Sequence, residues 1–373
     1  MIPILSLKEQ TAGLREEILA ALGGVIDAQA FAGGPAVAAF EDALSAYLGC
    51  RHSVGVNSGT SALHGALICA GVGAGDEVIT VPHTWISTSW AISYVGARPV
   101  FVDVDRVTAG IDPARIESAI TERTRAILLV HLYGHPVDLN PVLAVAQSRG
   151  IPVIEDSAQS LGARYRGRHT GTFGLVNTTS FYPGKNLGAF GEGGAVFTDD
   201  PAIATRLRAL RDHAQAGRHH HTELGFNWRM DGLQGAVLSV KLRHLDRWNA
   251  RRREIAARYL AGMAQARGLV LPAPQAWAEP NWHIFPVYHQ RRDEFRAKLE
   301  AMGVQTGVHY PRPIHLQPAY AWLGHRPGDF PVAEELAATE ISLPMFAELT
   351  DAQVEAVISA VCEVSAQIEN AVG

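Results

Sequence analysis

The chain has 373 residues, of which 47% are hydrophobic and 18% charged, and its formal net charge is -5. This length predicts two domains, or one large domain with a smaller one appended, whereas the negative charge and the scattered lysine and arginine residues exclude nucleic acid as an expected partner. No apolar run approaches the roughly 20 residues that a membrane-spanning helix needs, so we expect no membrane partner.

The first part of the chain predicts two helices, a strand and a third helix. Apolar residues recur at helical spacing over residues 14–22 and 35–48. Residues 52–56 predict a short strand, and residues 62–67 predict a helix that follows it directly. The connection between this strand and this helix is therefore a short turn.

That turn, Asn-Ser-Gly-Thr-Ser at residues 57–61, is a candidate anion site. The free N–H groups and the positive end of a helix attract a phosphate. Gly59 would let the backbone approach the ligand closely, and Thr60 would add a hydroxyl. An ordinary capped helix is the alternative. Two rival phosphate motifs fail, because the chain has no GxxxxGK[ST] pattern and the glycines at 71–75 do not open a helix.

Further strands alternate with helical segments along the next hundred residues. Apolar runs predict strands at 76–81, 99–103, 125–130 and 151–154, and residues 141–149 predict a helix. This alternation is typical of an α/β fold with a mostly parallel sheet and right-handed crossovers.

Two side chains follow strand ends, where ligands of open α/β sheets bind. Trp85 could stack on a flat cofactor ring, although a core position is the alternative. Asp156 follows the buried strand at 151–154 and would point into the crevice, although it could instead cap a following helix.

The segment 180–194 contains one lysine, Lys185, among several glycines and a proline, and predicts a tight irregular loop. A lysine on such a loop can be held in a cleft and desolvated until its amine is nucleophilic. A Schiff-base lysine and an aspartate that pairs with a pyridinium nitrogen are the two groups that pyridoxal phosphate requires. Lys185 and Asp156 together therefore indicate a pyridoxal phosphate site.

The remaining chain predicts a strand at 195–198, a polar loop at 217–221, and mixed elements after that. Three adjacent histidines in the loop have no carboxylate or cysteine partner at metal-ligand spacing, so we expect no metal site. A charged helix over 247–258 marks a boundary between a large domain, residues 1–245, and a small C-terminal domain, residues 246–373. The other expected elements are helices at 201–211, 233–245, 292–302, 332–340 and 350–369 and a strand at 283–289.

The three cysteines, Cys50, Cys69 and Cys362, lack metal-ligand spacing and are odd in number. This pattern is typical of free thiols in a reducing compartment, so we expect a cytoplasmic protein.

Taken together, six motifs resemble those of the DegT-type (DegT/StrS) sugar aminotransferases, and the resemblance covers nearly the whole chain. It implies the type I aminotransferase fold, with a mostly parallel seven-stranded sheet in the large domain and a smaller C-terminal α/β domain. It also implies a homodimer with shared active sites. The motifs lie at residues 57–61, 83–88, 155–160, 180–194, 225–231 and 309–315.

The resemblance also implies roles for single residues. Lys185 matches the lysine that binds pyridoxal phosphate covalently, Asp156 matches the partner of the pyridine nitrogen, and Trp85 occupies the ring-stacking position. The other cofactor contacts that it implies are Gly59, Thr60 and Ser180 at the phosphate, Gln159 beside the ring hydroxyl, and Asn227 reaching the phosphate from the neighbouring subunit, with Arg229 close by.

The implied reaction moves an amino group from L-glutamate to a nucleotide-linked keto-sugar, through the pyridoxamine phosphate form of the cofactor. Residues 181–189 resemble the branch that acts on dTDP-3-keto-6-deoxyhexoses, which favours a 3-keto sugar. Tyr182, His309, Tyr310 and His315 are hypothetical substrate contacts, with loop packing as the alternative for the two histidines.

Three other functions remain as alternatives. A 4-keto sugar or a keto-cyclitol could be the acceptor. The chain could also be a non-catalytic regulator that binds the cofactor, although intact Lys185, Asp156 and Gln159 argue against this. A nucleotide-binding dehydrogenase is disfavoured because its glycine fingerprint is missing.

Overall fold

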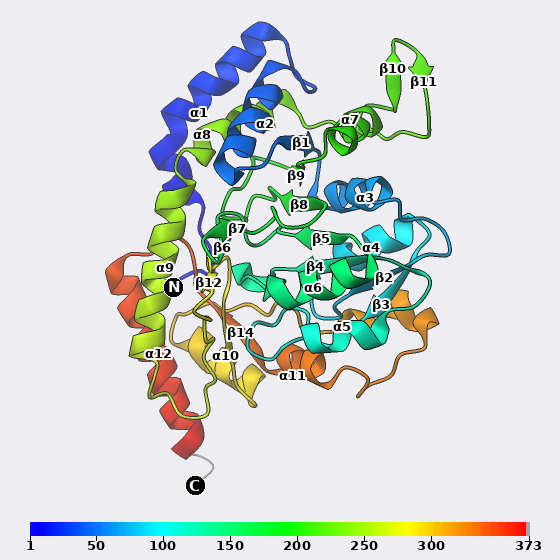
Figure 1. Ribbon diagram of the computed structural model, residues 1–373. Coiled ribbons are helices and arrows are strands. Elements are labelled where there is room, and N and C mark those ends of the chain that lie inside the picture. The colour runs from blue at the N-terminus through cyan, green and yellow to red at the C-terminus, as the bar shows by residue number, and fades with distance from the viewer. Residues whose placement is uncertain (371–373) are drawn as a thin grey trace.

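A seven-stranded sheet forms the centre of the computed structural model, which describes residues 1–370 (Figure 1). Its strand order is β1-β9-β8-β5-β4-β2-β3. Within it β9 is antiparallel to both neighbours, and the other strands share one direction. The predicted α/β fold with a mostly parallel sheet is confirmed. The strands are β1 (His52–Val56), β2 (Glu77–Thr80), β3 (Arg98–Phe101), β4 (Thr124–Val130), β5 (Val153–Asp156), β8 (Val176–Ser180) and β9 (Gly194–Thr198).

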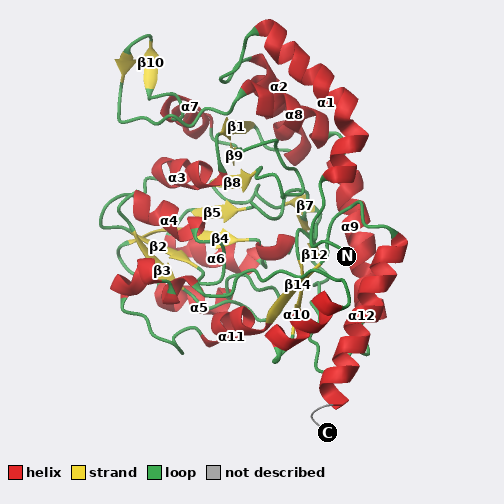
Figure 2. Cartoon of the chain, turned by 180° about the vertical axis from the view of Figure 1, so that it is seen from behind, coloured by secondary structure: helices red, strands yellow, loops and turns green. Residues whose placement is uncertain are grey.

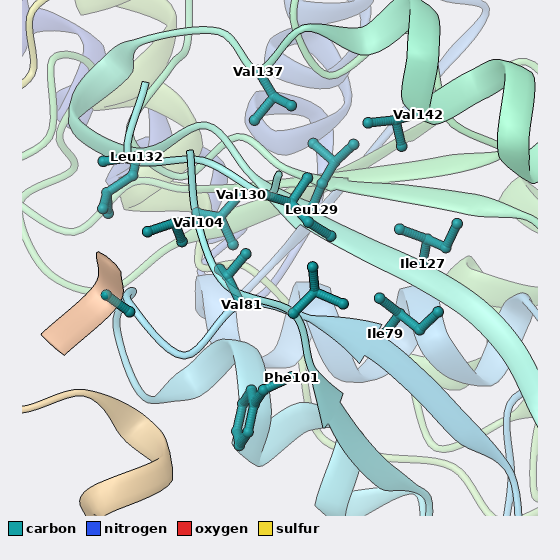
Figure 3. Packing of buried hydrophobic residues seen from close by; sticks show 14 of the residues in the cluster. Ile79, Val81, Phe101, Val104, Ile127, Leu129, Val130, Leu132, Val137 and Val142 are labelled. Carbon is teal, nitrogen blue, oxygen red and sulfur yellow. The ribbon is translucent and has the colours of Figure 1, made fainter. Parts of the chain in front are cut away.

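Helices cover both faces of the sheet, because successive strand side chains point to opposite faces. Ile79 and Ile127 pack with α5 and α6 on one face, and their neighbours Val78 and Ala126 pack with α3, α4 and α7 on the other. Figure 3 shows the first of these clusters from close by. The covering helices are α3 (Gly59–Cys69), α4 (Ser87–Tyr94), α5 (Pro113–Ala119), α6 (Leu139–Arg149) and α7 (Pro201–Leu210).

A layer of three helices, α1 (Lys8–Ala28), α2 (Pro35–Leu48) and α8 (Gly232–Leu242), lies beside β1 and β9 (Figure 1). The ends of α2 follow from local chemistry. Gly34 precedes it with a φ of 83°, the first helical residue is a proline, and Gly49 ends it with a φ of 74°. Proline suits the first helical position, and glycine tolerates the left-handed conformation after the last.

The C-terminal part has its own hydrophobic cluster, in which Phe285, Phe295 and Val361 are fully buried. Its long helices, α9 (Leu245–Gly262) and α12 (Asp351–Asn370), lie side by side (Figure 2). Among residues 1–370, no helix has the length and apolarity needed to cross a membrane. The other elements are β13 (Phe285–Tyr288), antiparallel to β14 (Glu340–Leu343), the helices α10 (Arg292–Ala301) and α11 (Pro331–Thr339), and the short helices η2 (Ile314–Leu316) and η3 (Pro318–Leu323).

We propose residue 245, the first residue of α9, as the end of the large domain. Two groups of side chains cross this boundary. Ile2 and Leu5 pack against the C-terminal cluster, whereas Ile314 and Phe330 belong to the cluster under the large sheet. Each part therefore contributes side chains to the hydrophobic cluster of the other.

Several elements differ from the expectations. The helices α4 and α5 and the strand β8 were not predicted, because α4 and β8 are rich in serine and threonine and α5 has only seven residues. The segment 217–221, expected as a polar loop, contributes to an exposed hairpin (Figure 1). The strands of this hairpin are β10 (Gln215–Gly217) and β11 (His220–His221). A small separate sheet consists of β6 (Arg164–Tyr165), β7 (Arg168–His169) and β12 (Ala278–Glu279). One further short helix is η1 (Leu132–Gly134).

The start of α7 supplies a stability prediction. The Asp200 carboxylate accepts hydrogen bonds from the backbone N–H groups of Ala202 and Ile203, at 2.7 and 3.3 Å. Replacing such a cap with alanine costs about 1 kcal/mol. We expect Asp200→Ala to speed amide hydrogen exchange in α7 about fivefold, and Asp200→Asn, which keeps an acceptor oxygen, to change it little. Equal exchange in the wild type and both variants would contradict this role.

Candidate active site

A cavity of about 690 Å³ opens at the carboxyl ends of the parallel strands. Asp156 ends β5, Ser180 ends β8, and Thr84 follows β2, and all three line the cavity. The C-terminal part supplies further lining residues, including His309 and Tyr310. The cavity therefore lies between the sheet and the C-terminal part of the chain, where ligands of open α/β sheets bind.

Lys185 lies in the loop between β8 and β9 and lines this cavity. Its backbone N–H donates to the carbonyl of Tyr182 at 2.8 Å, which closes a turn. Gly188 packs so tightly that a Cβ atom there would lie 2.2 Å from the carbonyl oxygen of Pro183. Burial lowers the pKa of Lys185 to about 8, against the opposing attraction of Asp156. The loop thus holds a lysine of which about a tenth is the free amine at pH 7, far more than for an exposed lysine.

Asp156 is buried and held on both oxygens. Oδ2 accepts from the hydroxyl of Thr88 at 3.0 Å, and Oδ1 accepts from the N–H of Ala158 at 3.1 Å. Burial raises its pKa, while these two hydrogen bonds and the charge of Lys185 oppose the increase. The helix-capping alternative fails, because residues 158–162 form turns and no helix follows Asp156 there.

The anion site predicted at residues 57–61 is the first turn of α3, which begins at Gly59. Ser58 caps the helix by accepting from the N–H of Ser61 at 3.1 Å. A Cβ atom on Gly59 would lie 2.7 Å from the Cβ of Ser180, so glycine allows α3 to meet β8 there. Gly59, Thr60 and Ser180 line the cavity, with the Thr60 hydroxyl donating to Ser87 at 2.9 Å. The helix is therefore capped and also directed at the cavity.

Three more expected residues line the cavity. Trp85 is not a core residue, since 55% of its surface is exposed. It lines the cavity beside Tyr310, with the two ring centres 5.5 Å apart. Gln159 accepts from the N–H of Tyr133 at 2.6 Å and donates to the Tyr310 hydroxyl at 3.2 Å. Tyr182 lines the mouth and is 56% exposed.

Three expected residues do not line the cavity. Asn227 is exposed, and Arg229 pairs with Asp212. His315 is buried against Phe330, with its Nε2 3.1 Å from a Glu334 oxygen, so its packing alternative describes the structure.

Sequence reasoning missed residues that hold the cavity-lining side chains in place. Thr88 holds Asp156, and Tyr133 holds Gln159 through its backbone. Glu155, the neighbour of Asp156, is fully buried and bonded to His131 at 2.9 Å. The only sequence signal for a role of Thr88 in the site is its position after a strand end, in the segment around Trp85.

The cavity fits a flat aromatic cofactor that carries a phosphate. A helix N-terminus beside glycine and hydroxyl side chains suits the phosphate. A buried carboxylate suits a ring N–H, and a desolvated lysine suits a carbonyl carbon. Among residues 1–370, no group of three or more His, Cys, Asp or Glu side chains could hold a metal ion.

Comparison with known proteins agrees with this geometry. The sequence of residues 13–362 matches the pattern of the DegT/DnrJ/EryC1/StrS aminotransferase family. The chain belongs to this family. DegT-type aminotransferases similar to it include the dTDP-3-amino-3,4,6-trideoxy-alpha-D-glucose transaminase of Streptomyces venezuelae, which is 46% identical over 99% of this chain and 98% of the relative.

Solved structures of DegT-type aminotransferases also match. The crystal structure of DesV from S. venezuelae, in complex with a ketimine intermediate, superposes with a TM-score of 0.96 and 46% identity over 98% of each chain. The Bacillus subtilis protein NtdA, with bound PMP, superposes with a TM-score of 0.90 and 31% identity over 98% of this chain and 83% of its own. The predicted aminotransferase fold is confirmed.

The packing at Gly59 yields a prediction for cofactor binding. In Gly59→Ala the added methyl group would collide with Ser180 and move the helix end from the cavity. We expect affinity for pyridoxal phosphate to fall at least about fivefold, since overpacking costs about 1–3 kcal/mol. Gly73→Ala is the matched control, because nothing lies within 4 Å of its added Cβ atom. Equal affinities from absorbance titration of the two variants would refute the close approach.

The pKa of Lys185 yields a second prediction. The apoprotein should capture pyridoxal phosphate faster as pH rises, because only the neutral amine attacks a carbonyl. With a pKa of about 8, the rate should rise about tenfold between pH 7 and pH 9 and then level off. Stopped-flow absorbance measures this rate. A rate that keeps rising toward pH 10.5 would show that the lysine is not desolvated.

Proposed function

We propose that this chain transfers the amino group of L-glutamate to a nucleotide-linked keto-sugar, with pyridoxal phosphate as its cofactor. The observation that carries this proposal is the placement of Lys185, Asp156 and the α3 N-terminus around one cavity. Membership of the aminotransferase family and the PMP-bound relative support the cofactor.

When bound, pyridoxal phosphate withdraws electrons from the carbon that loses a proton. The Asp156 carboxylate is fixed by Thr88 and Ala158, so it would accept a hydrogen bond from the ring nitrogen and favour its protonated form. The phosphate would be held by the backbone N–H groups of Gly59 and Thr60 and by the hydroxyl groups of Thr60 and Ser180. Trp85 would cover the ring, and Gln159 would lie beside the ring hydroxyl.

Lys185 would act as the acid and base. Its amine, with a pKa of about 8, can take a proton from the α-carbon of the donor and return it during the step. A group that titrates close to the working pH exchanges protons most effectively. Both half-reactions can use the same lysine, because donor and acceptor occupy the cavity in turn.

We favour a dTDP-3-keto-6-deoxyhexose as the acceptor. The support is the similarity to the S. venezuelae relative, a dTDP-3-amino-3,4,6-trideoxy-alpha-D-glucose transaminase. Tyr182, His309 and Tyr310 line the cavity and are our proposed sugar contacts. Arg229 pairs with Asp212 and does not line the cavity of its own chain, so it is not among these contacts. A 4-keto sugar or a keto-cyclitol remains the second acceptor class to test.

We also propose a homodimer with shared active sites. Asn227 is exposed and lies outside the cavity of its own chain, which supports its proposed contribution to the cavity of a neighbouring subunit. The three free thiols support a cytoplasmic location.

The test is an absorbance spectrum of the purified protein, first alone, then with L-glutamate, and then with a panel of nucleotide keto-sugars and keto-cyclitols. We expect a visible band that L-glutamate removes and one ketone restores. The ketone that restores it names the acceptor. A band that no amino donor removes would favour the non-catalytic regulator.

Lys185→Ala should abolish turnover, because no other described lysine lines the cavity. Lys298→Ala removes a lysine on α10 and should leave turnover unchanged. Near-wild-type activity in Lys185→Ala would sink the assignment.

A further inference from the structure

Three side chains, those of Glu340, Ser342 and His309, form a hydrogen-bonded relay from the interior of the C-terminal part to the cavity. Glu340 and Ser342 are both buried and both lie on β14, two residues apart, so they share one face of the strand. The Ser342 hydroxyl contacts Glu340 Oε1 and lies 2.7 Å from Nδ1 of His309. The other Glu340 oxygen accepts from the backbone N–H of His309 at 2.7 Å.

His309, at one end of this relay, faces the cavity. His309 lines the cavity, and its Nδ1 is engaged by Ser342. Its backbone carbonyl accepts from the Tyr133 hydroxyl at 2.6 Å, so the residue is fixed at its N–H, its C=O and one ring nitrogen. Within residues 1–370, no hydrogen bond is found at Nε2, which leaves this atom for a ligand.

A serine hydroxyl has one proton and can donate it to only one of its two neighbours. If Glu340 is ionised, Ser342 donates to Oε1, Nδ1–H donates to Ser342, and Nε2 presents a lone pair. If Glu340 is protonated, its O–H donates to Ser342, Ser342 donates to Nδ1, and Nε2 carries the proton. The two arrangements differ by one proton overall.

We propose that Glu340 and Ser342 are positioning residues that set the tautomer of His309, and thereby whether a keto-sugar in the cavity meets an N–H donor or a lone pair. This rests on the proposed function for the identity of the ligand. The relay lets Nε2 give a proton to an oxygen of that ligand. As this N–H bond breaks, the Ser342 proton moves to Nδ1 and the Glu340 proton moves to Ser342, so the ring stays neutral.

The surroundings favour the donor state near neutral pH. Burial raises the pKa of Glu340 to about 8, opposed by the hydrogen bonds from Ser342 and His309. Burial and the charge of Lys185 lower the pKa of His309 to about 4, so the imidazole is neutral. The titratable and charged groups that face this relay from neighbouring elements are Arg292 and Arg296 of α10, Tyr288 of β13, Tyr133 of η1, Tyr310, His283 and Lys185.

The wild-type holoenzyme, labelled with ¹⁵N in histidine, tests the relay by NMR between about pH 6 and pH 10. We expect Nε2 of His309 to carry the proton at low pH and Nδ1 to carry it at high pH, with a midpoint at about 8. The spectrum of His309→Gln identifies the signal. A tautomer that stays the same across this range would overturn the proposal.

Two variants separate the relay from simple packing. In Glu340→Gln the amide N–H₂ donates permanently to Ser342, so Nε2 should keep its proton at every pH. Ser342→Ala retains the bond between Glu340 and the His309 N–H but breaks the relay, so the pH-dependent exchange should be lost. Persistence of the exchange in either variant would contradict the relay.

Glu334→Gln is the matched control, because it alters a different glutamate–histidine contact, at His315, and should leave the His309 signal unchanged. The NMR result needs no sugar. A relay seen without turnover of any keto-sugar would therefore refute the proposed acceptor alone, whereas turnover with an invariant tautomer would refute the relay alone.

Discussion

Two opposite charges share a cavity at the end of the central strand, and the rest of the site is arranged around them. A buried carboxylate or ammonium is costly unless it is paired and hydrogen-bonded. Asp156 meets this requirement through Thr88, Ala158 and the nearby Lys185. Burial raises the pKa of Asp156 and lowers that of Lys185, and the attraction between the two groups opposes both shifts. Such perturbed pKa values are what acid–base chemistry needs.

Close backbone packing then gives the cavity its shape. Gly59 lets α3 approach β8, and Gly188 lets the lysine loop fold back on Pro183. Gly194 allows a similar approach, since a Cβ there would lie 2.5 Å from the carbonyl carbon of Ser58. A lysine loop, a helix N-terminus and a strand end meet only because these contacts contain no side chain.

The sequence revealed the parts of this site whose signal is local. The apolar strand before Asp156, the glycines around Lys185 and the polar turn before α3 each have a recognisable pattern, and the family resemblance assigned their order. Features that depend on tertiary contacts could not be predicted from the sequence. The polar strand β8 is buried by its neighbours on both sides, and α4 is held by Ala91 and Ile92 in the core rather than by helix propensity. His315 looked equivalent to His309 in sequence, and only packing separates them.

The segment formed by His309 and Tyr310 is bonded to both parts of the molecule. Glu340 and Ser342 hold it from the C-terminal strand β14, while Tyr133 and Gln159 hold it from the large sheet. A rotation of one part relative to the other cannot leave all four contacts intact. The geometry of this wall of the cavity thus depends on the angle between the two parts, so a change in that angle would move the side chains of His309 and Tyr310.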